Sequence, residues 1–134
     1  MRFLFIAVLL VGLLACNPAP PPQMTATFGQ QFSLKLGQTA KMDDGLLVTF
    51  EDVPSDGRCS SCTASFLAVM NLRMTAPGQP PALVVVKTPP FAGVDGAPPP
   101  YTVKYINLQP QHNTPNDALN RADYVVTLMV TKTP

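Results

Sequence analysis

Apolar and polar residues alternate along most of the chain from Phe28 onward. The side chains of a β-strand point alternately to opposite faces, so a period of two predicts strands buried on one face. The first clear case is 32–36, where Phe, Leu and Leu are separated by Ser and Lys. Further strands are expected at 40–42, 46–50, 64–75, 101–108 and 124–131, and the short β-branched run 83–86 between prolines predicts another.

Turn and loop residues divide these expected strands. Residues 43–45 are Asp-Asp-Gly, which tolerate the positive φ of tight turns, so a hairpin is predicted over 40–50. The middle of 64–75 is apolar on both faces, which predicts a central strand. Most of the sixteen prolines fall between the expected strands, where no backbone N–H is needed for strand pairing. We therefore expect residues 28–134 to form an all-β, antiparallel β-sandwich of Ig-like or Greek-key type, with seven or eight strands.

The N-terminus has a different pattern. After Arg2, residues 3–14 form an almost unbroken apolar run of twelve, and Ala15 precedes Cys16. A membrane-spanning helix needs about 20 such residues, so the run is typical of an export signal. The small residue before the cysteine resembles the bacterial lipobox, in which the signal is cut before the Cys and lipid is attached to its thiol. The alternatives are an ordinary secretory signal with a chance cysteine, or a buried helix.

The segment 16–27 is expected to be a tether. Four of its residues between 18 and 22 are prolines, which favour an extended chain.

Loss of residues 1–15 would remove one of the nine Lys and Arg, so the remaining eight basic residues balance the eight Asp and Glu. The basic residues are scattered, which argues against nucleic-acid binding. Attachment to the membrane would therefore depend on acyl chains such as palmitate on Cys16. By the rule that accompanies the lipobox, Asn17 favours the outer membrane or cell surface, facing the periplasm or the exterior.

Two cysteines remain, Cys59 and Cys62, and in an oxidising compartment an even pair predicts a disulfide. A bond across so short a loop would stabilise the fold by about 2 kcal/mol. The alternatives are a redox Cys-x-x-Cys and a soft Cu(I) site that includes Met70, Met74 and His112. The two methionines would lie about 13 Å apart along a strand and could not both reach one ion, and His112 is expected to be a solvated loop residue, so no metal is expected. No other cofactor is expected either.

No catalytic residues are expected. The chain lacks the nucleophile, zinc and phosphate-loop motifs that mark common enzyme families. The adjacent acidic pairs at 43–44 and 51–52 would point to opposite faces of a strand and do not converge. Asp56 and Arg58 are two apart and are expected to form an ion pair, which makes them the candidate ligand loop.

Four segments carry a resemblance to a family: 32–38 (Phe-Ser-Leu-Lys-Leu-Gly-Gln), 56–59 (Asp-Gly-Arg-Cys), 101–110 and 123–128. In order and spacing they resemble small bacterial lipoproteins of unknown function. The resemblance implies a β-sandwich in the cell envelope and carries no assigned activity. The function expected is thus a lipid-anchored, non-catalytic structural or binding role, with an unknown envelope protein or component as partner. The alternative is a periplasmic thiol-redox or copper-handling protein that uses Cys59 and Cys62.

Overall fold

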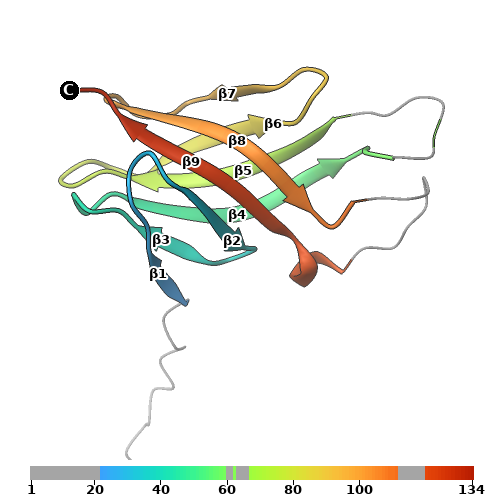
Figure 1. Cartoon of the computed structure of the whole chain (residues 1–134), viewed down its shortest axis with the longest axis horizontal. Coiled ribbons are helices and arrows are strands. Elements are labelled where there is room, and N and C mark those ends of the chain that lie inside the picture. The colour runs from blue at the N-terminus through green and yellow to red at the C-terminus, as the bar shows by residue number, and fades with distance from the viewer. Residues whose placement is uncertain (1–21, 60–61, 63–66, 112–119) are drawn as a thin grey trace, which may run out of the picture.

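The structure is a computed structural model that describes residues 22–59, 62, 67–111 and 120–134. It is a β-sandwich of two layers, with β8 and β9 crossing over the larger sheet in Figure 1. The described residues contain nine strands and one 3₁₀ turn, η1. The elements are β1 (Gln23–Thr25), β2 (Gln31–Lys35), β3 (Thr39–Lys41), β4 (Leu47–Asp56), β5 (Ala68–Thr75), β6 (Ala82–Lys87), β7 (Gly93–Asp95), β8 (Tyr101–Gln109), η1 (Arg121–Asp123) and β9 (Val125–Lys132).

The larger sheet has the order β1-β3-β4-β5-β6-β7, and the smaller sheet has the order β2-β9-β8. All neighbours are antiparallel except β1 and β3, which are parallel. The reason is the route of the chain, which leaves the larger sheet to form β2 before it returns as β3. The larger sheet is therefore mixed, where a wholly antiparallel sandwich was expected.

Each of the seven segments predicted to be a strand contains one, and the β-sandwich itself is confirmed. The two additional strands, β1 and β7, have three residues each and form opposite edges of the larger sheet. Each contains a single apolar residue, Met24 or Val94, so no alternation marks it, whereas the equally short β3 belongs to an alternating run over 39–42. Because β1 begins at Gln23, the sandwich starts within the segment that was expected to be tether.

The core lies between the two sheets and consists of the alternate residues of each strand. On β5, which lies between β4 and β6 as expected for a central strand, Ala68, Met70, Leu72 and Met74 are fully buried. Burial of a side chain the size of Leu or Met stabilises a fold by about 1.5–3 kcal/mol, so this strand anchors the larger sheet. The smaller sheet contributes the buried residues Phe32, Leu34, Tyr101, Val103, Leu108, Val126, Leu128 and Val130.

The predicted turn at 43–45 joins β3 to β4 and confirms the hairpin. The N–H of Gly45 donates to the carbonyl of Met42 (3.0 Å), and the N–H of Met42 donates to the carbonyl of Leu46 (2.8 Å). Gly45 has a φ of 93°, a left-handed conformation that glycine adopts without steric penalty.

Candidate functional site

The candidate ligand loop begins at the last residue of β4, Asp56. Its carboxylate accepts two hydrogen bonds from the guanidinium of Arg58, one from Nε (2.8 Å) and one from Nη2 (2.7 Å). It also accepts from the backbone N–H of Arg58 (3.2 Å) and from the hydroxyl of Tyr124 (2.9 Å), which precedes β9. The predicted ion pair therefore exists and is tied to the smaller sheet through Tyr124.

Arg58 makes a second connection to the smaller sheet. Its Nη1 donates to the carbonyl of Leu108 (2.6 Å), near the end of β8, and its Nη2 donates to the carbonyl of Pro110 (2.9 Å), just after that strand. We call the group formed by Asp56, Arg58, Tyr124 and these two carbonyls the Arg58 bridge. It joins the end of β4 in one sheet to β8 and the start of β9 in the other.

The Arg58 bridge is largely removed from water. The side chains of Arg58 and Asp56 are only 14% and 6% exposed, so the low energy expected of an exposed ion pair does not apply. Burial alone raises the pKa of the Asp56 carboxyl, but the hydrogen bonds from Arg58 and Tyr124 and the Arg58 charge outweigh it, so the pKa is lowered. Burial and the hydrogen bond to Asp56 raise the pKa of Tyr124 to about 12. At neutral pH the carboxylate is thus ionised and the phenol is protonated.

These contacts decide what the bridge can do chemically. A guanidinium has five N–H donors, and Arg58 makes four side-chain hydrogen bonds to protein oxygens. An outside anion could therefore reach at most one N–H of Arg58 unless it displaced Asp56 or the carbonyls of Leu108 and Pro110. The geometry is that of a brace between the two sheets.

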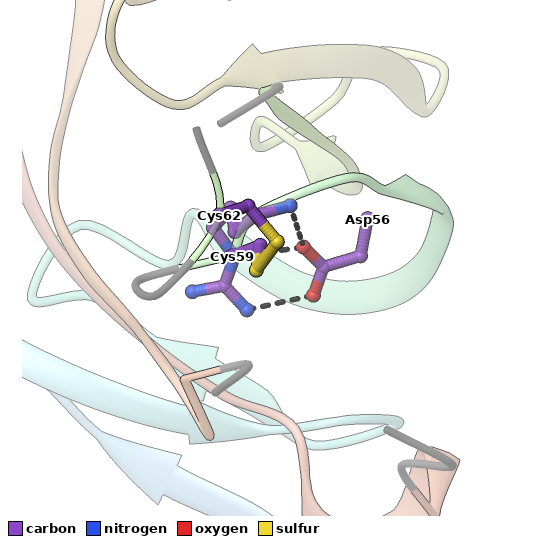
Figure 2. The surroundings of a disulfide bond; sticks show 4 residues. Asp56, Cys59 and Cys62 are labelled. Carbon is purple, nitrogen blue, oxygen red and sulfur yellow. Dashed lines mark hydrogen bonds and ion pairs between the residues drawn. A yellow bond between two sulfur atoms is a disulfide. The ribbon is translucent and has the colours of Figure 1, made fainter. Parts of the chain in front are cut away.

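The bridge is followed at once by the disulfide between Cys59 and Cys62, whose Cα atoms lie 5.4 Å apart. Cys59 is buried, and Cys62 is half-buried. Figure 2 shows the carboxylate of Asp56 pointing toward the segment that carries the disulfide. The cysteines are paired as expected, and their bond closes the loop that starts from the bridge.

A second polar group, not anticipated from the sequence, connects the sheets elsewhere. The carboxylate of Asp44 accepts from the N–H of Leu46 (2.9 Å), the hydroxyl of Tyr101 (2.7 Å) and the ammonium of Lys132 (2.8 Å). Burial raises the pKa of Asp44, but the hydrogen bonds from Lys132, Leu46 and Tyr101 outweigh it and lower the pKa to about 2. The sequence indicated only the turn at Asp44, because Tyr101 and Lys132 lie far along the chain.

One open hollow of about 410 Å³ lies between the first described residue and the start of β9. It is lined by Pro22, Lys35, Leu36, Gly37, Gln38 and Ala122. Sequence patterns did not mark it, since it is formed by the turn after β2 and by η1, which are adjacent only in the folded chain.

The residues weighed for a copper site are separated by the fold. Met70 and Met74 are fully buried in the core, and the cysteines are bonded to each other. His112 and the predicted lipidation site, Cys16, lie outside the described residues. Within the described residues, no group of three or more His, Cys, Asp or Glu is arranged to hold a metal ion.

A scan against protein-family models found no match, and searches of curated proteins and of solved structures found no similar chain. In the part of the chain that the structure describes, no helix is long and apolar enough to cross a membrane.

Proposed function

We propose that this chain is a lipid-anchored envelope protein with a non-catalytic, structural or binding role. The observation that carries the proposal is the order of its N-terminal segments: one basic residue, an apolar run, Ala15-Cys16 and a proline-rich stretch that leads to Pro22. Lipid on Cys16 would hold the sandwich outside the cytosol, where the Cys59–Cys62 bond is stable. The resemblance to small bacterial lipoproteins supports the same location.

The polar groups of the sandwich support a binding or structural role rather than catalysis. Among the described residues, every buried side-chain N and O atom has a hydrogen-bond partner. Asp56 and Arg58 hold each other and the smaller sheet, and Asp44 holds Tyr101 and Lys132. Groups committed in this way keep the two sheets in register and are poorly placed to exchange protons with a substrate.

The test is the intact mass of the protein isolated from membranes of the cells that make it. We expect residues 1–15 to be absent and acyl mass to be present on Cys16. A Cys16→Ser variant should lack the acyl mass and move from the membrane to the soluble fraction. A protein that retains its first residue and carries no acyl group contradicts the proposal. Crosslinking in the native envelope would then identify the component that it binds.

The thiol-redox or copper-handling alternative rests on the spacing of Cys59 and Cys62 and makes a different prediction. Alkylation with and without a reductant, followed by mass measurement, counts the free thiols. A bond that resists mild reduction, in a protein that binds no copper, favours the structural role. Rapid reduction by a small dithiol, or one copper bound per chain, favours the alternative.

A further inference from the structure

The hollow beside Pro22 has donors for an anion and no acid among its lining residues. The ammonium of Lys35 forms no ion pair with any described residue, and its side chain is exposed. The side-chain carbonyl of Gln38 accepts the backbone N–H of Lys35 (3.0 Å). That bond uses the oxygen of the Gln38 amide and leaves its NH₂ group as a donor.

The remainder of the lining is apolar. Pro22, Leu36 and Ala122 form this part of the wall, and Leu36 also packs against the core. Gly37 has no atom within 4 Å of the position that a Cβ would occupy, so the hollow is open above the turn. A cationic donor beside an apolar surface suits a ligand that carries a negative group on an apolar body. The volume of about 410 Å³ is within the usual range of small-molecule sites.

The position of the hollow indicates the source of such a ligand. Pro22 is six residues after Cys16, and an extended chain spans at most about 3.3–3.6 Å per residue, so the two are at most about 22 Å apart. Figure 1 shows the chain entering the sandwich beside β1, at the edge of the larger sheet opposite β7. If Cys16 is lipidated, the wall of the hollow at Pro22 is within about 22 Å of the anchor, so lipid headgroups are within its reach.

We infer that the hollow binds the phosphate of an anionic phospholipid in the membrane that holds the anchor. Lys35 and the amide of Gln38 bind the phosphate, and Pro22, Leu36 and Ala122 contact the glycerol and the upper acyl chain. This inference rests on the proposed lipid anchor. It would fix the orientation of the sandwich on the membrane, which a tether alone does not do.

The experiment uses the full, lipidated protein in nanodiscs of phosphatidylcholine with and without phosphatidylglycerol. We expect phosphatidylglycerol to shift the amide resonances of Gly37 and Ala122 in a saturable manner. A lysine near an anionic surface contributes about 1 kcal/mol, so Lys35→Gln should weaken this response about fivefold. Ala122→Leu, which fills the hollow, should abolish it. Lys104→Gln removes an exposed charge on β8, away from the hollow, and should leave it unchanged.

Four results would overturn the inference: no shift with phosphatidylglycerol, an equal shift in phosphatidylcholine alone, an undiminished response in Lys35→Gln, or the same shift caused by inorganic phosphate. The last result would indicate a site for free anions. A protein that fails to stay on the nanodiscs contradicts the anchor instead. The hollow is then tested with water-soluble dihexanoyl phosphatidylglycerol, where the same variants must give the same order of responses.

Discussion

Replacement of Arg58 by Met tests the most consequential contact between the two sheets. The variant keeps a side chain of similar length and removes four hydrogen bonds, two to Asp56 and two to the carbonyls of Leu108 and Pro110. It also removes the cation that faces a carboxylate only 6% exposed. Loss of one partner from a buried ion pair destabilises a protein by about 3–5 kcal/mol. With a urea dependence of about 2 kcal/mol per M, the unfolding midpoint should fall by about 2 M.

The chain contains no Trp, so unfolding is best followed by far-UV circular dichroism. The matched control is Arg121→Met, which breaks an ion pair with Asp52 in which the side chains are 64% and 39% exposed. Exposed pairs contribute about 0–1 kcal/mol, so this variant should change the midpoint little. If Arg58→Met loses no more stability than Arg121→Met, the bridge does not brace the sandwich and the reasoning fails.

The loss of stability in Arg58→Met should also depend on pH, with a sign that follows from the pKa of Asp56. The folded-state pKa of Asp56 is lowered, so its contribution is present above the unfolded pKa of about 3.9 and is lost as the pH falls through the folded value. The stability difference between the parent protein and Arg58→Met should therefore be largest near neutral pH. It should shrink as the pH falls below about 4, where the carboxyl of the unfolded chain is protonated first and that of the folded protein follows at lower pH. A difference that stays constant down to acid pH contradicts the assignment of the penalty to Asp56.

Three further changes probe other parts of the fold by urea unfolding. Gly96→Ala should destabilise more than Gly29→Ala: both glycines have positive φ (90° and 76°), but only at Gly96 would a Cβ meet a backbone carbonyl at 2.5 Å. Equal losses would exclude a steric cause. Asp44→Asn should reduce stability by about 1 kcal/mol at neutral pH because the pair is partly exposed. That difference should vanish as the pH falls from about 4 through about 2, the folded-state pKa; a loss that persists in acid contradicts it. Reduction of Cys59–Cys62 should cost about 2 kcal/mol, and a protein equally stable in reductant would show that the bond does not constrain the unfolded chain.

Local patterns in the sequence located seven of the nine described strands and the turn between β3 and β4, but not the pairing of distant strands. Alternation of period two located β2 and the buried face of β5, because one side of each strand must be apolar to pack on the other sheet. It could not reveal β1 and β7, which are held by backbone pairing at the sheet edges. Nor does alternation contain information on the parallel pairing of β1 with β3, which depends on the route of the chain.

In the candidate site, too, the contact between near neighbours was predictable and the contacts between distant segments were not. Asp56 and Arg58 are two residues apart, so their ion pair was predictable. Its burial was not, because it depends on Tyr124 and the carbonyl of Leu108, which are contributed by another sheet. The hollow likewise needs Ala122 to close against the turn after β2. Contacts between distant segments follow from the packing of the sheets, and a single sequence does not specify that packing by its local pattern.

The position of β9 (Val125–Lys132) has a consequence for how the chain reaches its folded state. This strand is the last of the described strands to be synthesised, yet it lies in the middle of the smaller sheet, and both β2 and β8 pair with it there. A nascent or truncated fragment that stops before Val125 has no smaller sheet, and the apolar face of the larger sheet remains in contact with water. The smaller sheet can therefore form only after β9 has been synthesised. A fragment that ends before Val125 should aggregate rather than fold as a smaller domain.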